Sequence, residues 1–199
     1  MKIGTIGAGN IAQAVVRHAA KAGFEIVISS KSGPAALTEL AATLGPSVRA
    51  GTVAEAVQAD LVLLSVPWDA VAEILGQVPA WRGQILMDTT NAISYPDFQP
   101  LDLGEKTSTE IVAELAPGAR VVKGFNALGA AILALDPSEG AGKRVIFISG
   151  DDASAKTEVL QFLASMGFAG IDLGSLATGG RFQQFPGVLA GNNLAQFPV

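Results

Sequence analysis

The stretch that decides the fold is Met1-Lys2-Ile3-Gly4-Thr5-Ile6-Gly7-Ala8-Gly9-Asn10-Ile11-Ala12. An apolar run leads into the pattern Gly7-x-Gly9-x-x-Ala12, and a helical pattern follows directly. In such a pattern the first glycine permits a tight turn, the second lets the backbone approach phosphates, and a small third residue lets the helix pack on the strand. The helix N-terminus offers free N–H groups to an anion. The stretch therefore predicts a dinucleotide pyrophosphate site, with a glycine-rich turn that binds nothing as the alternative.

Short apolar segments alternate with helical patterns along most of the chain, which is typical of a parallel, doubly wound sheet. The predicted strands are residues 3–6, 25–29, 48–50, 61–66, 84–88, 120–123, 145–149 and 169–173. The predicted helices are residues 10–22, 34–44, 53–58, 69–75, 108–115 and 153–166, the last capped by Asp151-Asp152. We expect an α/β fold of the Rossmann type with a mainly parallel sheet. Residues 1–199 are expected to form a single domain, with 175–199 as a C-terminal extension.

Composition narrows the class of protein. The chain has 199 residues, 49% hydrophobic and 16% charged, with a net charge of −5, so a general positive field for nucleic acid or anionic membrane is absent. There is no cysteine and one histidine, His18, which argues against disulfides and against thiolate or His-rich metal sites. No apolar run reaches the roughly 18 residues of a spanning helix, and no signal pattern is seen. We expect a cytoplasmic protein that binds neither membrane nor metal.

The end of the second predicted strand bears on the choice of cofactor. An acidic residue at this place accepts the ribose 2′-hydroxyl of NAD. Here the sequence is Ser29-Ser30-Lys31-Ser32, without an acid. Hydroxyls and an ammonium suit the 2′-phosphate of NADP, which a carboxylate would repel. We therefore expect NADP, with Ser30 and Lys31 at its 2′-phosphate; a merely solvated polar loop is the alternative.

Three loops should meet at the carboxyl ends of the strands, where such sheets bind ligands. They are residues 66–68, 90–92 and 125–129, and they are rich in small, aromatic and amide side chains. Trp68 is suited to border a flat aromatic ligand; the alternative is that it only packs at the end of a strand.

Candidate acid–base groups are few. Asp88 is expected to bond local backbone, and Lys123 is more typical of a structural or surface lysine than of a catalyst. His18 is expected on an exposed helix surface. We therefore predict no catalytic acid–base residue. Hydride transfer between two bound rings needs mainly proximity and alignment, and this site suits that chemistry.

The C-terminal residues 182–199 carry no charge, although Gln, Asn, Pro and Gly interrupt their apolar character. Such a tail is expected to be covered, either by its own domain or by another subunit.

Taken together, six segments resemble the NADPH-dependent oxidoreductases of the deazaflavin coenzyme F-420. The segments are residues 6–12, 29–31, 65–68, 123–127, 150–152 and 172–176. The resemblance implies a homodimer in which NADPH passes a hydride directly to a deazaflavin ring. By position it implies that Gly7, Gly9, Asn10 and Ile11, with Ala8 in the same turn, hold the pyrophosphate. It implies that Pro67, Asn91, Ala127 and Leu128, with Val66 and Trp68 beside them, surround the reacting rings.

The residues that the resemblance assigns to the hydride acceptor are more variable in this family than those that it assigns to NADPH. The deazaflavin carries an anionic tail, and Arg181 is the only cation near the C-terminus. Two alternatives stay open: an NADPH-dependent reductase of another small acceptor (an imine, a quinone or a ferric chelate), and a non-catalytic NADP-binding redox sensor. Pyrroline-carboxylate reductases share the N-terminal half, but the long helical dimerisation domain that they need is missing here.

Overall fold

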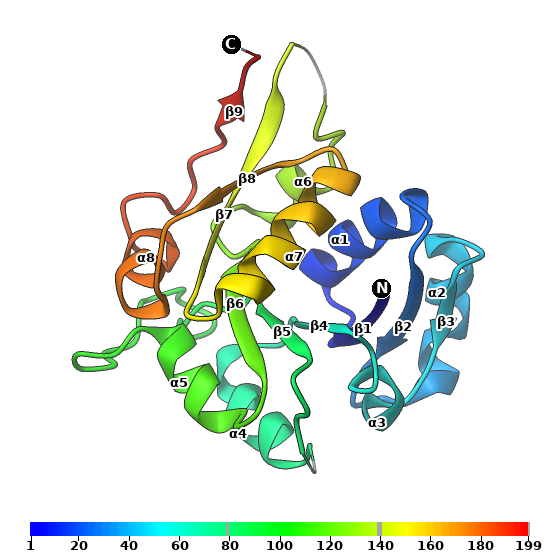
Figure 1. Cartoon of the computed structure of the whole chain (residues 1–199). Helices are drawn as coiled ribbons and strands as arrows, with labels where there is room; N and C mark the ends of the chain where they lie inside the picture. The colour runs from blue at the N-terminus through cyan, green and yellow to red at the C-terminus, as the bar shows by residue number, and fades with distance from the viewer. Residues whose placement is uncertain (79, 139–140, 199) are drawn as a thin grey trace.

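The centre of the molecule is a twisted sheet, shown in Figure 1, and the computed structural model describes residues 1–78, 80–138 and 141–198. The strands are β1 (Lys2–Ile6), β2 (Glu25–Ser29), β3 (Val48–Ala50), β4 (Leu61–Leu64), β5 (Ile85–Asp88), β6 (Arg120–Gly124), β7 (Lys143–Gly150), β8 (Ala169–Asp172) and β9 (Ala195–Gln196). Their order is β3-β2-β1-β4-β5-β6-β7-β8, and β9 pairs with β7. The neighbours from β3 to β6 run parallel, whereas β7 is antiparallel to β6. The prediction of a mainly parallel, Rossmann-type sheet is confirmed.

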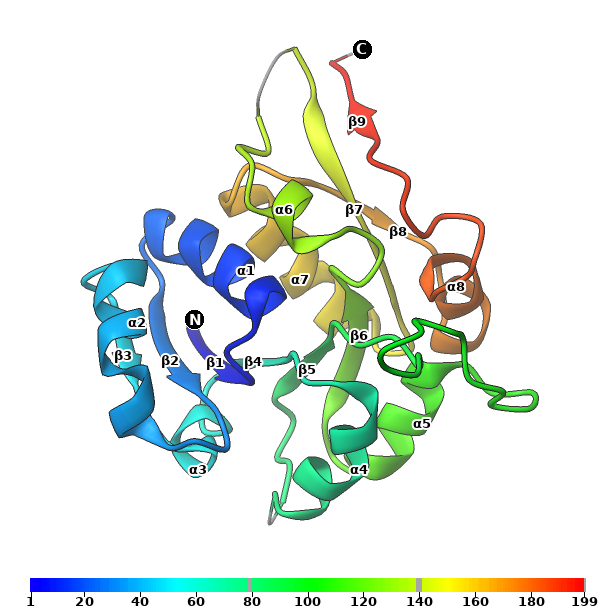
Figure 2. The ribbon, with the colours of Figure 1, turned by 180° about the vertical axis from the view of Figure 1, so that it is seen from behind.

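Helices cover both faces of the sheet, as Figures 1 and 2 show. They are α1 (Asn10–Lys21), the 3₁₀ helix η1 (Pro34–Leu37), α2 (Thr38–Leu44), α3 (Val53–Ala56), α4 (Trp68–Gly76), α5 (Ser108–Leu115), α6 (Ala130–Leu133), α7 (Ala153–Ser165) and α8 (Leu176–Gln183). In β4, Leu61 and Leu63 join a core with α1, α2, α6 and α7, while Val62 and Leu64 join another with α4, α5 and α8. An unbroken apolar strand is what a sheet buried on both faces requires. Among the described residues, no helix is both long and apolar enough to cross a membrane.

The main differences from the sequence prediction lie in short or glycine-rich elements. The predicted helix 34–44 begins as the 3₁₀ turn η1, and the helices α6 and α8 and the short strand β9 were not predicted. Only Asp152 caps α7, by accepting the Ala155 N–H at 2.7 Å. Asp151 instead accepts the N–H of Leu176, at 3.0 Å, and so fixes the start of α8.

Helix α8 contains Gly179 and Gly180, which disfavour a helix in isolation. The packing of α8 against its neighbours explains why glycine stands at both positions. A Cβ on Gly179 would lie 2.7 Å from the Ser149 Cβ and 2.8 Å from the Leu173 Cβ, and one on Gly180 would lie 3.2 Å from the Thr109 Cγ2. The glycines therefore let α8 approach β7 and α5 closely, and this close approach brings the residues after α8 to the mouth of the sheet.

We expect Gly179→Ala to lower the free energy of unfolding by about 1–3 kcal/mol, because the added methyl group overpacks a closed interface. Urea denaturation followed by circular dichroism measures this. Gly76→Ala, in α4, is the matched control: a Cβ there meets no atom within 4 Å. It should be neutral or stabilising by up to about 1 kcal/mol. Equal effects of the two substitutions would contradict the packing explanation.

Candidate functional site

The turn between β1 and α1 has the geometry that its glycines require. Gly7 has φ of +104°, and a Cβ there would lie 2.0 Å from the Ser65 carbonyl oxygen. A Cβ on Gly9, by contrast, would meet no atom within 4 Å. Helix α1 begins at Asn10 without a side-chain cap, so its first N–H groups lack protein partners. A pyrophosphate fits here: Gly7 closes the turn, and the bare backbone at Gly9 leaves room for the phosphates.

A cavity of about 480 Å³ opens at the carboxyl ends of the parallel strands. Its wall is formed by Gly9, Asn10, Ile11, Ser65, Val66, Pro67, Trp68, Thr89, Thr90, Asn91, Ile93, Tyr95, Phe98, Asn126, Ala127, Leu128, Gly129, Phe185, Ala190 and Gly191. It lies at the topological switch point, where β1 and β4 are neighbours and the chain leaves them in opposite directions.

Nine of the predicted site residues line this cavity: Gly9, Asn10, Ile11, Val66, Pro67, Trp68, Asn91, Ala127 and Leu128. Gly7 and Ala8 belong to the turn that leads to it. Ser30 and Lys31 lie outside its wall, just past the end of β2. Lys31 is exposed and takes part in none of the ion pairs found among the described residues.

Three exposed aromatic residues form the mouth of the cavity, which we call the aromatic mouth: Phe185, which the resemblance places on the acceptor side, and Tyr95 and Phe98, which the sequence prediction missed. Tyr95 and Phe98, on the loop after β5, are each 58% exposed, with their ring centroids 5.1 Å apart in an edge-to-face pair. Phe185 follows α8 and is 42% exposed. The only sequence signal for this mouth is aromatic residues in segments without helical or strand periodicity. The prediction that the uncharged tail is covered by its own domain holds only in small part: Gln183 is buried, whereas Phe185, Val188 and Phe197 are each more than 40% exposed.

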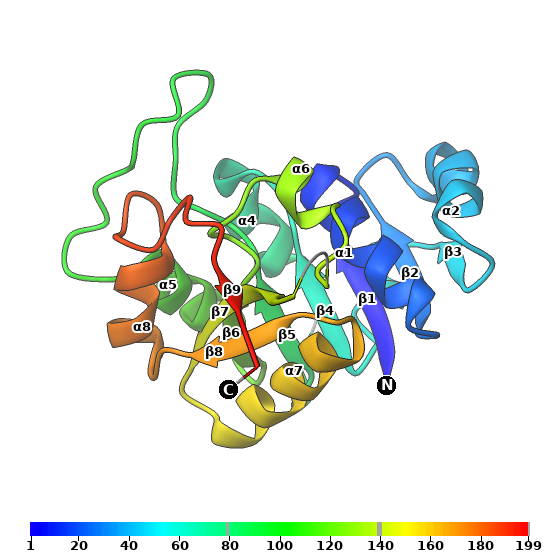
Figure 3. The ribbon, with the colours of Figure 1, turned by 90° about the horizontal axis from the view of Figure 1, so that it is seen from above.

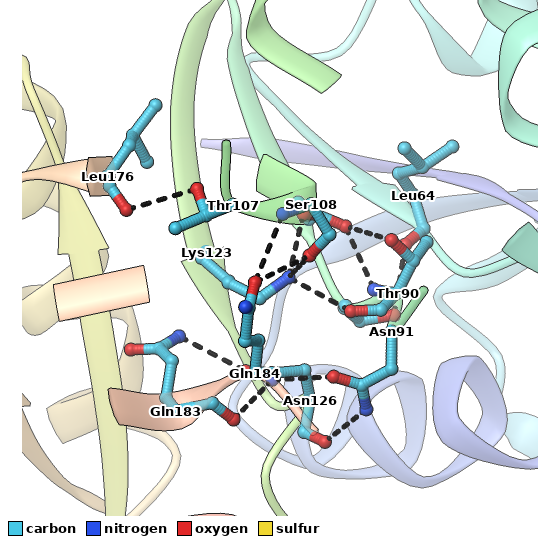
Figure 4. A network of polar contacts seen from close by, with 12 residues as sticks. Leu64, Thr90, Asn91, Thr107, Ser108, Lys123, Asn126, Leu176, Gln183 and Gln184 are labelled. Atoms are coloured by element: carbon cyan, nitrogen blue, oxygen red, sulfur yellow. Dashed lines mark hydrogen bonds and ion pairs between the residues drawn. The ribbon is translucent and has the colours of Figure 1, made fainter. Parts of the chain in front are cut away.

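A buried ion pair lies among the strand ends. Asp88 and Lys123 face each other in the register of β5 and β6, and both side chains are fully buried. The Lys123 Nζ donates to the Asp88 Oδ2 at 3.0 Å, to the Thr90 carbonyl at 2.9 Å and to the Ser108 Oγ at 3.2 Å (Figure 4). The Asp88 Oδ1 accepts the N–H and the hydroxyl of Thr90, at 2.9 and 2.7 Å. All three ammonium donors are used, so Lys123 is structural, and its role is to hold the loop that carries Thr90 and Asn91.

An amide network joins the strand-end loops to the residues after α8. The Asn91 Nδ2 donates to the Asn126 carbonyl at 2.9 Å, and the Asn126 Nδ2 donates to the Asn91 Oδ1 at 3.0 Å (Figure 4). The Gln183 Nε2 donates to the Asn126 Oδ1 at 3.1 Å. The Phe185 N–H donates to the Asn91 Oδ1 at 3.1 Å. One side of the cavity is thus fixed by three segments that are far apart in sequence.

The backbone conformation of Phe125 shapes one wall of the site. Phe125 follows β6 directly and has φ of +60°, while its ring is buried against Phe168. A left-handed phenylalanine is strained by about 1–3 kcal/mol, and such strain clusters at functional loops. The left-handed conformation of Phe125 turns the chain so that residues 126–129 enter the cavity wall.

The prediction that His18 is exposed is wrong: the side chain is half-buried, and its Nε2 lies 2.8 Å from the Leu133 carbonyl oxygen.

Residues 2–92 match the family of NADP oxidoreductases described as coenzyme F420-dependent. This match covers the pyrophosphate turn, the Ser30-Lys31 segment and the loop through Asn91. Residues 2–92 therefore carry the domain of that family, and the match supports the resemblance found in the sequence.

Solved structures extend the likeness to the whole chain. A hypothetical protein, SMa0349 from Sinorhizobium meliloti, is 46% identical, with a TM-score of 0.93 over 98% of this chain and 96% of the other. A protein from Arthrobacter sp. FB24, provisionally assigned as an F420-dependent NADP reductase, is 26% identical, with a TM-score of 0.70 over 88% of this chain and 86% of the other.

Curated relatives include the metalloreductase STEAP3 of Rattus norvegicus, 28% identical over 93% of this chain and 36% of the relative. The chain spans about a third of the length of the curated relatives that it matches. Together these likenesses support an NADP-linked oxidoreductase.

We expect Lys123→Met to lower the free energy of unfolding by about 3–5 kcal/mol, because Asp88 would remain buried and unpaired. Adding Asp88→Asn should recover part of this loss, so the double variant should be more stable than the sum of the single effects predicts. Lys2→Met removes an exposed pair with Glu25 and should cost less than about 1 kcal/mol. A Lys123→Met variant that unfolds at the denaturant midpoint of the wild type would contradict this.

Proposed function

We propose that this protein transfers a hydride between NADPH and a deazaflavin of the coenzyme F-420 type, which share the cavity at the strand ends. The observation that carries the proposal is the chemistry of the wall. No carboxylate, imidazole, guanidinium or ammonium of the described residues lines it, while amides, aromatic rings and bare backbone do. Such a wall can align two flat rings and exclude water.

The nucleotide half of the proposal rests on main-chain geometry. Gly9 and the first turn of α1 face the place of the pyrophosphate, and Ser30 and Lys31 follow the end of β2, where the ribose 2′-phosphate is expected. When bound, NADPH supplies the hydride from its nicotinamide. Pro67 and Asn91 line the cavity, and in this proposal they contact the nicotinamide.

The acceptor half rests on the aromatic mouth. Exposed rings at a cavity entrance favour a planar ligand, because stacking buries apolar area on both partners. The hydride brings two electrons to the acceptor ring, and the accompanying proton comes from solvent, since the described wall holds no carboxylic acid, imidazolium or ammonium to donate it.

Reduction of a ferric chelate is the second candidate, and the likeness to a metalloreductase favours it. Ferric iron accepts one electron at a time, so this reaction needs a ring that takes a hydride and releases single electrons. The same aromatic mouth suits such a mediator.

The first experiment mixes the purified protein with NADPH and oxidised F-420 and follows the visible absorbance of the deazaflavin. We expect bleaching with NADPH and a rate with NADH at least about tenfold lower. Gly9→Val is the control: its side chain enters open space, so the variant should keep the thermal midpoint of the wild type and lose NADPH binding. Bound NADPH without bleaching would contradict the acceptor, and reduction of ferric citrate with added riboflavin would then favour the second candidate.

Lys31→Glu tests the 2′-phosphate site. The substitution replaces an attractive charge with a repulsive one, so NADPH should bind about 10- to 100-fold more weakly. NADH lacks the phosphate, and its affinity should change by less than about threefold. Calorimetric titration of both nucleotides measures this. Equal weakening of NADPH and NADH would remove Ser30 and Lys31 from the site.

A further inference from the structure

His18 lies in the last turn of α1, the helix whose first turn faces the proposed pyrophosphate site. Its Nε2 lies 2.8 Å from the carbonyl oxygen of Leu133. A carbonyl oxygen can only accept a hydrogen bond, so the Nε2 of His18 carries the proton and donates it. Figures 2 and 3 show α6 beside α1. The imidazole thus joins two helices that are far apart in sequence.

The acceptor of this bond stands at the C-terminal end of α6. Leu133 is the last residue of this helix, which has only four residues. The last carbonyl groups of a helix have no partner within the helix. The N–H of the following residue, Ala134, bonds to the carbonyls of Ala130 and Ile132, and the carbonyl of Leu133 accepts the imidazole N–H. His18 therefore caps α6.

The loop that precedes α6 forms part of the large cavity. All four of its residues, 126–129, line the wall. The loop begins after Phe125, whose ring meets the Phe168 ring edge to face, with 5.9 Å between the ring centroids. The His18 ring makes the same kind of contact with Phe168, at 5.2 Å. We call these three residues the aromatic clamp. It holds the start of the loop through Phe125 and the end of α6 through His18.

The two halves of this loop are held differently. The carbonyls of Asn126 and Ala127 accept bonds from the loop after β5 and from the C-terminal tail, at 2.9 and 2.7 Å. The second half is continuous with α6, because the Gly129 carbonyl accepts N–H groups of that helix. The position of Leu128 and Gly129 in the wall therefore follows the position of α6, which His18 links to α1.

Helix α1 connects the two parts of the cavity that a dinucleotide would span. Asn10 begins the helix and lines the cavity, and His18 follows eight residues later. An α-helix rises about 1.5 Å per residue, so the two residues are about 12 Å apart along its axis. A rigid rod of this length fixes where the loop 126–129 lies relative to the pyrophosphate turn. Hydride transfer is sensitive to such an offset, because the reacting atoms must approach to about 3–3.5 Å.

We propose that His18 is a positioning residue: by capping α6, it fixes the wall loop 126–129 relative to α1 and so aligns the rings between which the hydride passes. The described wall of the cavity does not include His18, so the residue acts through α6 and not by contact with a substrate. The assignment rests on the proposed function in one respect, that hydride transfer takes place in this cavity.

Hydrogen exchange followed by mass spectrometry tests the link without turnover. His18→Phe keeps a ring beside Phe168 and removes the donor. We expect the amides of residues 127–134 to exchange about three- to tenfold faster, while those of α4, on the other face of the sheet, keep their rate. His18→Leu removes the donor in the same way and serves if the larger ring does not fit.

Two further variants control this experiment. His18→Gln places an amide N–H where it can reach the same carbonyl, so it should restore the exchange rate of the wild type. Arg17→Gln is the matched control, because Arg17 also lies on α1 and donates to a backbone carbonyl, that of Thr43 in α2. It should leave the exchange of residues 127–134 unchanged.

Kinetics with NADPH and F-420 give a second readout. His18→Phe should lower kcat about tenfold and change the KM for NADPH by less than about twofold, because alignment of the rings is lost and the nucleotide turn is kept. NADPH deuterated at the transferred position should then show a larger isotope effect than with the wild type, since hydride transfer limits the rate more fully. His18→Gln should restore both values. A smaller amount of folded protein would lower the rate and leave the isotope effect as it was.

Three results would overturn the proposal. One is exchange of residues 127–134 in His18→Phe and His18→Leu at the rate of the wild type. Another is exchange that rises by the same factor in α4, since the loss would then be global. The third is faster exchange of the loop with kcat and the isotope effect unchanged. If the wild type does not reduce F-420, the proposed function fails, and the exchange rates decide whether His18 positions the wall loop.

Discussion

The buried pair of Asp88 and Lys123 is the interaction on which the site depends. The two residues stand at the carboxyl ends of adjacent strands, where one surplus charge would be costly without its partner. Their bonds hold the loop after β5 through Thr90 and the first residue of α5 through Ser108. Ser108 in turn donates its N–H to the Gln184 Oε1 at 3.1 Å. The charge pair therefore fixes not only two strands but also the segment that follows α8.

The two sides of the cavity at the strand ends differ in the chemical groups that they present. On the side proposed for the nucleotide, the protein offers main chain and small residues, as at Gly9 and the first turn of α1. On the side proposed for the acceptor, it offers side chains, namely the aromatic mouth and the amides of Asn91 and Asn126. Main-chain sites are tied to the turn between strand and helix, whereas side-chain sites change with single substitutions. This division is consistent with a family match over residues 2–92, which include the turn at Gly9 and the first turn of α1.

The sequence predicted the parallel part of the sheet well, because buried apolar strands such as Leu61–Leu64 and capped helices such as α7 leave strong local patterns. It did not predict α8, since Gly179 and Gly180 oppose a helix locally and are favoured only by packing against β7 and α5. The sequence also did not predict Tyr95 and Phe98 in the cavity wall, because they reach it through the irregular fold of the loop after β5. The roles of Lys123 and His18 depended on partners more than 30 residues away, which no local pattern reports. Because α8 and β9 both join β7, we propose that residues 175–199 belong to the same folding unit.

The aromatic mouth has a thermodynamic consequence. Tyr95, Phe98 and Phe185 keep large parts of their rings in water around an open cavity. Water ordered on apolar rings contributes heat capacity that is lost when the rings are covered. A ligand that stacks there would carry a negative heat capacity change, whereas a nucleotide held mainly by N–H groups and charges would carry a smaller one. The affinities of the cavity for the two substrates would then depend differently on temperature. A plot of the logarithm of the binding constant against inverse temperature would curve more strongly for the acceptor than for the nucleotide.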